Sequence, residues 1–364
     1  MSMSLYGKGF YIWKIPSCEG GDPTAIATAA KNAGLGHVII KIADGTYDYN
    51  YNTTTKADLI APVAEALLLK GIRVWGWHYV YGDLPREEAK AAIRQIKKLP
   101  LDGYVIDAEG HYKDKYQSAK IFMNELRAVL PDYPIALSSY RYPSYHPQLP
   151  WTQFLSKCDY NFPQMYWEQA HNPDEQLIRS YNEFLLLNPV RPYVPTGAAY
   201  ASGGWIPTTT DIKKFLDTVI SLKLTGASFW SWDYCRLKLP EIWQAIADYK
   251  WTGTPPPQPQ FYDLFINYLN DRNVAGLVNL YAENVVLVTA KKTIQGKNAI
   301  NGWFTALLNT TYPTATFSLE SCSGSENSKT LVWKISVAGG ATISVEDTLG
   351  MLDGKIVYHY CSLQ

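Results

Sequence analysis

Eight short β-rich runs alternate with helical patterns between residues 9 and 250 of this chain. Strand, helix and strand in repeated order are typical of a parallel sheet, because the helix returns the chain to the end of the sheet where the next strand begins. Eight such repeats favour an α/β fold of the (β/α)8 TIM barrel type over an open doubly wound sheet. The expected strands are residues 9–14, 37–42, 73–79, 103–107, 134–138, 160–166, 192–196 and 226–232.

Helices are expected between the strands, for example over residues 55–70 and 85–98, where apolar residues recur at helical spacing. No GxGxxG or phosphate-loop motif follows any of the expected strands. The usual nucleotide-binding sites of α/β proteins are therefore excluded.

Residues 251–260 contain four prolines, at positions 255, 256, 257 and 259. Proline fixes φ and removes a backbone donor, so this segment is expected to be an extended, semi-rigid spacer. The chain therefore divides into a barrel domain of residues 1–250, a linker of residues 251–260 and a smaller domain of residues 261–364.

The smaller domain begins with helical patterns and continues with alternating patterns. Its expected helices are residues 261–269, 274–281 and 297–308, and its expected strands are 314–322, 329–337, 342–349 and 355–363. Gly339-Gly340 and Asp353-Gly354 are hairpin signals between these strands. We predict an α+β domain in which one antiparallel sheet packs against helices.

Composition favours an uncharged partner. The chain has 33 Lys and Arg residues and 33 Asp and Glu residues, so there is no global support for binding nucleic acid or anionic membrane. Aromatic residues make up 14% of the chain, with 12 Trp and 27 Tyr, and flat rings of this kind stack against sugars or fill a core. The expected partner is a carbohydrate.

The five cysteines stand at long spacings without a CxxC pair, so neither a disulfide framework nor a zinc site is indicated. We expect reduced thiols, no metal and no cofactor. The N-terminus lacks the apolar run of a signal peptide, and no stretch of about 18 apolar residues is present to span a bilayer. The expected location is the cytoplasm, with export by a leaderless route left open.

The candidate site follows from the barrel, because functional residues of such barrels lie at the C-terminal ends of the strands. Residues at these ends that are suited to sugar binding are Lys41, Trp77, His78, Tyr140, Gln164, Tyr166, Trp167, Trp230, Trp232 and Asp233. Some of them have a structural alternative: a lone histidine is often a hydrogen-bonded core residue, and the tryptophans also suit a packed lid.

Asp107 and Glu109 are the candidate catalytic residues. Positions i and i+2 of a strand share a face, so both carboxylates are expected to point into the barrel mouth roughly 7 Å apart. Ionisation of one carboxyl raises the pKa of the other, which allows proton donation near neutral pH. We assign Glu109 as proton donor and Asp107 as stabilising carboxylate. The alternative is that one of them anchors a loop or pairs with Lys41.

Four motifs resemble the bacterial and phage muramidases of glycoside hydrolase family 25: VIIKIADGT at 38–46, GWHY at 76–79, VIDAE at 105–109 and PQMYW at 163–167. The similarity spans most of residues 5–250. It implies that Glu109 is the acid and that Asp107 positions the N-acetyl group of the substrate. The family carries a further Asp on the first strand, where this chain has Tyr11 or Ile12.

The smaller domain resembles the SnoaL-like, nuclear-transport-factor-like cone fold. The similarity lies in residues 270–285, in QGKNAI at 295–300 and in DGKI at 353–356. The resemblance implies an isomerase or cyclase, a ligand-binding module or a homodimerisation domain. His359 and Asp347 are candidate polar groups of its pocket.

Three functional hypotheses follow. The first is a retaining or substrate-assisted glycosidase acting on an N-acetylated, peptidoglycan-like polysaccharide. The second is a non-catalytic carbohydrate-binding protein that dimerises through the cone domain. The third places isomerase-type activity or small-molecule binding in the cone domain.

Overall fold

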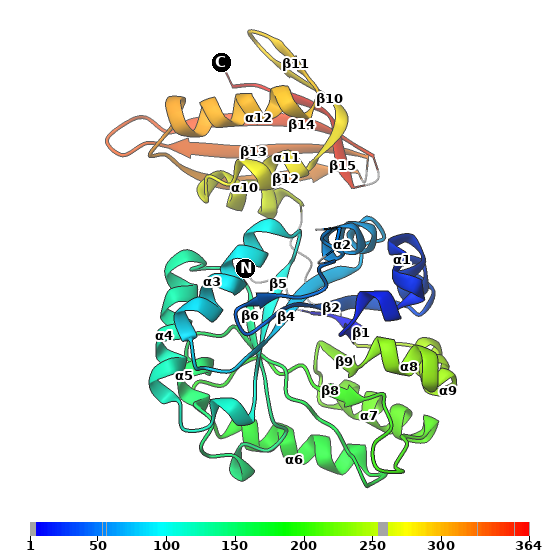
Figure 1. Ribbon diagram of the computed structural model, residues 1–364. Helices are drawn as coiled ribbons and strands as arrows, with labels where there is room; N and C mark the ends of the chain where they lie inside the picture. Colours follow the sequence, from blue (N-terminus) through cyan, green and yellow to red (C-terminus); the bar gives the residue numbers. More distant parts are fainter. Residues whose placement is uncertain are drawn as a thin grey trace. The chain divides into compact units, whose positions relative to one another are not determined.

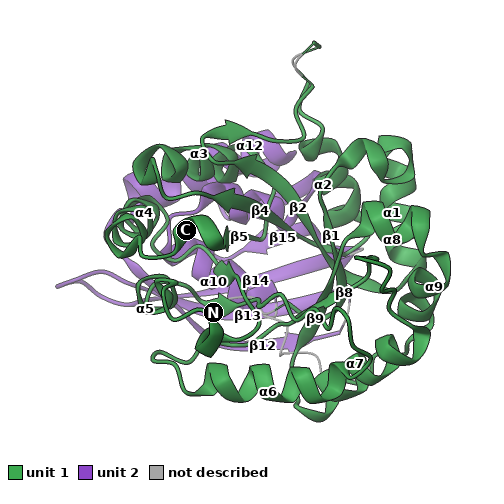
Figure 2. Ribbon diagram, turned by 60° about the horizontal axis from the view of Figure 1, so that its bottom comes forward, with its two compact units in different colours: residues 1–256 green, residues 257–364 purple. Residues whose placement is uncertain are grey.

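The computed structural model describes residues 5–52, 54–55, 57–253, 261–325, 327–352 and 354–363. The chain forms two compact units, residues 1–256 and 257–364, shown in different colours in Figure 2. Residues 254–260 of the predicted linker and Asp353 of the predicted hairpin lie outside the described residues.

A parallel sheet forms the centre of the N-terminal unit (Figure 1). Its strand order is β7-β6-β5-β4-β2-β1-β9-β8, and the short strand β3 pairs antiparallel with β2. The strands are β1 (Gly7–Ile12), β2 (Leu35–Asp44), β3 (Tyr47–Asp48), β4 (Arg73–Val80), β5 (Gly103–Ala108), β6 (Ile135–Ser138), β7 (Tyr160–Asn161), β8 (Thr196–Ala198) and β9 (Gly226–Trp230).

All eight expected strands are present, with shifted ends. β7 and β8 are shorter than expected because Pro163 and Pro195 have no N–H to donate to a neighbouring strand. Isolated parallel bridges, Asn161 with Tyr193 and Gln164 with Thr196, join the segments at the two ends of the strand order. The unit is thus a mixed α/β structure with a parallel half-barrel sheet.

Helices surround the sheet on its outer side (Figures 1 and 2). They are α1 (Pro23–Asn32), α2 (Ile60–Leu69), α3 (Pro85–Lys98), α4 (Tyr116–Val129), α5 (Trp151–Leu155), α6 (Pro173–Leu185), α7 (Thr209–Ser221), α8 (Trp232–Lys238) and α9 (Pro240–Asp248). The bounds of α3 match the prediction. It begins at Pro85, has acidic residues in its first turn and ends in two lysines, which suits the helix dipole.

Strand residues alternate between two apolar clusters. On β1, Phe10 and Ile12 pack in the large cluster shared with the helices, whereas Tyr11 packs in a smaller cluster with Ile39 and Trp77. Successive side chains of a strand point to opposite faces, so both faces of the sheet are covered. The smaller cluster lies beneath the strand ends and forms the base of the site described below.

The C-terminal unit packs helices against a six-stranded sheet of order β11-β10-β15-β14-β13-β12. Its elements are α10 (Phe261–Asn270), α11 (Val274–Asn279), β10 (Tyr281–Thr289), β11 (Thr293–Gln295), α12 (Lys297–Ala306), a π-helical turn (Leu307–Thr311), β12 (Thr316–Gly324), β13 (Ser328–Ser336), β14 (Ile343–Leu352) and β15 (Lys355–Cys361). Phe265, Leu269 and Phe304 from the helices join the apolar core over the sheet.

The predicted order of helices followed by strands was incomplete, because the hairpin β10–β11 lies between α11 and α12. Alternate residues Val285 and Leu287 of β10 are buried, which is the period of a strand with one covered face. Among the described residues of both units, no helix combines the length and apolar character needed to cross a membrane.

Gly103 begins β5, the strand that carries Asp107. An added Cβ at this position would lie 2.4 Å from the buried Trp75 ring, so we expect Gly103→Ala to lower the free energy of unfolding by about 1–3 kcal/mol. Urea titration followed by tryptophan fluorescence measures this change. Gly302→Ala in α12 is the control, because no described atom lies within 4 Å of its Cβ and alanine favours a helix. An unchanged urea midpoint for Gly103→Ala would contradict the proposed packing.

Candidate functional site

The two predicted carboxylates lie together at the C-terminal end of β5. The side-chain amide of Gln164, which follows β7, joins them: its Nε2 donates to Asp107 Oδ1 at 3.0 Å and to Glu109 Oε1 at 2.8 Å. One amide nitrogen thus uses both of its hydrogens on the two carboxyl groups. This contact fixes the two acids relative to each other and to the segment after β7.

An open cavity of about 260 Å³ contains this pair. Its walls come from the ends of β1, β5, β6 and β9 and from the segment after β7. The lining residues are Tyr11, Asp107, Glu109, Ser138, Gln164, Tyr166 and Trp230. Convergence of several strand ends on one cavity with a few polar groups is the usual form of a small-molecule site.

Asp107 has a pKa well above its ordinary value of 3.8. Burial is the largest cause, and the adjacent Glu109 adds to it through its charge and a hydrogen bond, while Lys41 and Gln164 act in the opposite direction. From the sequence, Glu109, the assigned proton donor, was the residue expected to have the raised pKa. In the structure Asp107 is the more deeply buried of the two and holds a proton at pH values where a solvated carboxyl has lost it.

Tyr11 stands where the first-strand acid of the muramidases was expected. Its side chain lines the cavity, and its hydroxyl oxygen is buried. Burial raises the pKa of this phenol strongly, and the charge of Asp107 raises it further, although the hydroxyls of Thr196 and Ser138 partly offset the shift. The Tyr11 side chain is therefore a neutral phenol. The cavity has two carboxyl groups and a phenol instead of three carboxyl groups.

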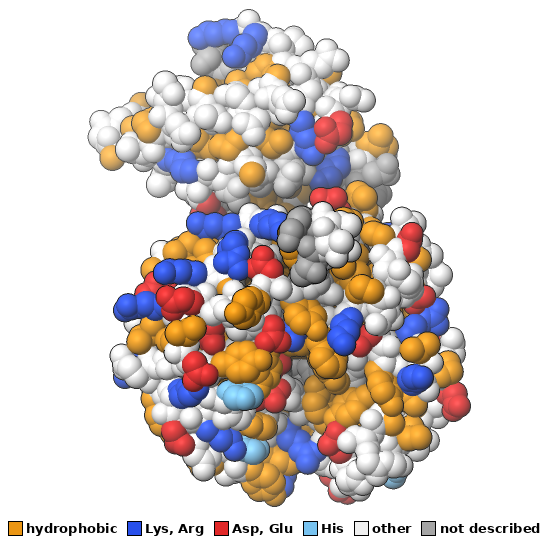
Figure 3. Space-filling model, viewed as in Figure 1, with side chains coloured by type: hydrophobic (Ala, Val, Ile, Leu, Met, Phe, Trp, Pro, Cys, Tyr) orange, Lys and Arg blue, Asp and Glu red, His pale blue; other side chains and the backbone are white. Residues whose placement is uncertain are grey.

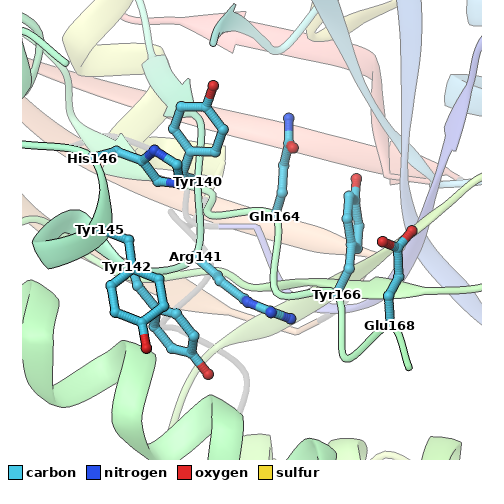
Figure 4. A pocket seen from close by; sticks show the side chains of 8 residues that line it. All are labelled: Tyr140, Arg141, Tyr142, Tyr145, His146, Gln164, Tyr166 and Glu168. Carbon is cyan, nitrogen blue, oxygen red and sulfur yellow. The ribbon is translucent and has the colours of Figure 1, made fainter. Parts of the chain in front are cut away.

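A second hollow of about 200 Å³ adjoins the cavity and shares Gln164 and Tyr166 with it (Figure 4). Its lining residues are Tyr140, Arg141, Tyr142, Tyr145, His146, Gln164, Tyr166 and Glu168. The rings of Tyr140 and His146 are stacked, with centroids 3.6 Å apart. Aromatic surfaces thus extend away from the carboxyl pair on one side.

Lys41 and Trp77 lie behind the cavity and do not line it. Lys41 Nζ forms a 2.6 Å ion pair with Asp44 and lies 4.7 Å from the centre of the Trp77 ring. Trp77 contacts Trp230 edge to face, with ring centroids 5.3 Å apart. The two residues hold the wall of the cavity, and Lys41 pairs with Asp44 rather than with either candidate acid.

Three residues predicted to bind substrate are fully buried in the core: His78, Trp167 and Trp232. Both ring nitrogens of His78 are occupied, Nδ1 by the Tyr104 hydroxyl at 2.8 Å and Nε2 by the Gly45 carbonyl at 2.7 Å. Burial lowers the pKa of His78 to about 4, so the ring is neutral. The two hydrogen bonds of His78 therefore stabilise the packing of the sheet.

Trp167 and Trp232 were predicted to bind substrate because each lies near the end of an expected strand. Trp167 packs against Phe215 with ring centroids 5.2 Å apart, and Trp232 packs against Trp243 at 4.8 Å. Trp232 is the first residue of α8, so its side chain belongs to the helix layer. The remaining predicted residue, Asp233, is half-buried and accepts a hydrogen bond from the backbone N–H of Trp13.

Trp13 was missed by the sequence analysis. It directly follows β1, is 39% exposed and lies beside Trp230, with ring centroids 6.1 Å apart. The rule that strand ends carry functional residues would have found it if applied to the first strand. Figure 3 shows how many hydrophobic side chains, coloured orange, reach the surface of the N-terminal unit between charged ones.

Comparison with known proteins concerns the C-terminal unit. The family described as SnoaL-like domain matches residues 262–359, so this unit is SnoaL-like, as its sequence motifs predicted. No curated protein matches the chain. These findings do not support the predicted resemblance of the N-terminal unit to glycoside hydrolase family 25.

Several solved structures are similar to parts of the chain. A proposed polyketide cyclase from Sinorhizobium meliloti shares 17% identity, covering 29% of this chain and 94% of that chain with a TM-score of 0.25. An NTF2-like protein of unknown function from Mesorhizobium loti shares 21% identity, covering 30% and 96% with a TM-score of 0.26. A proposed isomerase of the SnoaL-like family from Agrobacterium tumefaciens shares 18% identity, covering 28% and 93% with a TM-score of 0.26.

The raised pKa of Asp107 predicts a pH-dependent stability. Above about pH 4 the unfolded chain loses this proton and the folded protein keeps it, so wild-type stability falls as pH rises through this range. Asp107→Asn is neutral throughout, and its amide can donate to Glu109. We expect this variant to become more stable than wild type as the pH rises above about 4, with the gain vanishing near pH 4.

Chemical denaturation at a series of pH values measures this difference. Asp132→Asn, which changes an exposed carboxyl outside the cavity, is the matched control. A constant difference between Asp107→Asn and wild type from pH 4 to pH 8 would contradict the shift.

Proposed function

We propose that the N-terminal unit is a (β/α)8-barrel glycoside hydrolase that acts on an N-acetylated polysaccharide. The observation that carries this proposal is the Asp107–Gln164–Glu109 arrangement in an open cavity with aromatic walls. The parallel bridge between Gln164 and Thr196, at the two ends of the strand order, supports closure of the sheet into a barrel. Closure brings the end of β7 beside β8 and so surrounds the carboxyl pair.

The carboxyl pair suits acid catalysis. Burial and the neighbouring Glu109 raise the pKa of Asp107, which favours a proton on this side chain, and Asp107 is hydrogen-bonded to Glu109. Transfer of that proton along the bond makes Glu109 the acid, and Glu109 is the member less buried from solvent. Glu109 then protonates the glycosidic oxygen as its bond to the anomeric carbon breaks, and the electron pair of that bond leaves with the oxygen.

The same transfer leaves Asp107 ionised beside the positive charge that develops on the sugar. An acetamido group at the reacting sugar would place its N–H at Asp107, and its carbonyl oxygen would form the new bond to the anomeric carbon. Water then opens this cyclic intermediate, and Glu109 takes back the proton from that water. Tyr11, which lines the same cavity, adds a neutral phenol there where the muramidases carry a third carboxylate.

Hydrolysis of chitin-like oligomers and of peptidoglycan tests the proposal. We expect wild type to release reducing ends and Glu109→Gln to lower the rate by roughly 10²- to 10⁴-fold, because the amide cannot donate the proton. Glu65→Gln, at an exposed position of α2, is the control and should match wild type. No hydrolysis by wild type, or equal rates for wild type and Glu109→Gln, would disprove the proposed activity.

A non-catalytic carbohydrate-binding function uses the same cavity and differs in lacking turnover. Trp230 lines the cavity with the carboxyl pair, and the neighbouring ring of Trp13 is exposed enough to stack on a sugar. We expect Trp13→Ala to weaken binding of a chitin oligosaccharide by roughly 3- to 10-fold in titration calorimetry.

Tyr116→Ala, which removes a comparably exposed ring from α4, is the control for this experiment. Equal affinities for the two variants would exclude Trp13 from the binding surface. Saccharide binding by wild type without release of reducing ends would favour the binding function over the hydrolase. For the C-terminal unit we propose no reaction of an organic substrate, because Asp347 and His359 are completely buried.

A further inference from the structure

The interior of the C-terminal unit contains a cluster of Asp347, His359 and Cys361. Asp347 of β14 is paired directly with Cys361 of β15, and His359 lies two residues earlier on β15. Residues two apart on a strand share a face, so all three side chains project into the core between the sheet and the helices. All three are fully buried, and their potential ligand atoms lie within 4.8 Å of one another.

Two neighbouring side chains, Trp333 and Tyr281, form hydrogen bonds with residues of this cluster. Trp333 Nε1 donates to Asp347 Oδ2 at 2.8 Å, and the Tyr281 hydroxyl lies 2.8 Å from His359 Nδ1. Among the described residues, Asp347 Oδ1 and His359 Nε2 have no hydrogen-bond partner. His359 Nε2 lies 3.1 Å from Asp347 Oδ2, but this pair is not aligned as a hydrogen bond. A buried polar atom without a partner costs roughly 1–3 kcal/mol of stability.

We propose that Asp347, His359 and Cys361 bind one zinc ion in the core of the C-terminal unit. The atoms without hydrogen-bond partners are a carboxylate oxygen and an imidazole nitrogen, and the third residue supplies a sulfur. Zinc accepts this set of oxygen, nitrogen and sulfur ligands, whereas calcium and magnesium require oxygen ligands. Burial raises the pKa of the Cys361 thiol, so the zinc–sulfur bond forms as the thiol proton is released to solvent. The resulting thiolate and the Asp347 carboxylate carry two negative charges, which the divalent cation neutralises.

The surrounding contacts match those of zinc ligands in general. A ligating histidine is usually oriented through its other ring nitrogen, which is the contact that Tyr281 makes. The hydrogen bond from Trp333 orients the carboxylate in the same way. Ligand atoms about 2.0–2.3 Å from a tetrahedral zinc lie about 3.3–3.8 Å apart, and the three ligand atoms here lie within 4.8 Å of one another. A water molecule completes the coordination.

The zinc content of the purified full-length chain tests this proposal. After dialysis, we expect inductively coupled plasma mass spectrometry to find about one zinc ion per chain. Replacement of zinc by Co²⁺ is expected to give a thiolate-to-cobalt charge-transfer band in the near ultraviolet. Cys361→Ser is expected to lose both signals, and Asp347→Asn, which keeps the size of the side chain, is expected to lower the affinity for zinc at least tenfold.

Cys322→Ser is the matched control, because Cys322 lies on β12 of the same sheet and outside the buried cluster. It should keep the zinc and the cobalt band, and circular dichroism verifies that each variant is folded. Wild type without zinc and without a cobalt–thiolate band overturns the proposal, whether or not the variants fold. Full zinc retention in a folded Cys361→Ser variant overturns it as well. These outcomes are independent of the glycosidase assays.

Discussion

Burial of both faces of the parallel strands is the constraint on which the N-terminal unit depends. Phe10 and Ile12 on β1 pack under the helices, and Tyr11 between them packs in the inner cluster. A strand with both faces in apolar surroundings has only its end free for polar groups. Chemistry is therefore confined to the strand ends, where Asp107, Gln164 and Trp230 converge on one cavity.

The sequence pattern predicted most of the fold because the pattern itself reflects this burial. Each expected parallel strand overlaps an observed one, and α3 has the expected bounds, since apolar period and terminal charges act locally. The errors arose where a helical pattern runs directly into a strand pattern. The run from Tyr281 to Thr289 follows a helix without a Gly or Pro signal, so the strand β10 was missed.

The site was less predictable than the fold, because a strand-end position does not tell which way a side chain points. Asp107 and Glu109 stand two positions apart and share a face, so their meeting followed from sequence. His78 lies at a strand end as well, but its ring is directed between Tyr104 and the Gly45 carbonyl. The raised pKa of Asp107 depends on relative burial depth, which only the assembled structure gives.

The Asp107–Glu109 pair and the Asp347–His359–Cys361 cluster differ in whether all of their polar atoms have hydrogen-bond partners. This difference suggests different roles for the two clusters. In the N-terminal unit, Gln164 satisfies both carboxyl groups of a pair that faces an open cavity, so a proton can move there and a ligand can enter. In the C-terminal unit, Asp347 and His359 each keep an atom without a hydrogen-bond partner among the described residues, in a fully buried setting. An enclosed cluster of this kind admits an ion during folding more readily than an organic molecule afterwards. We therefore propose acid chemistry for the first cluster and metal binding for the second.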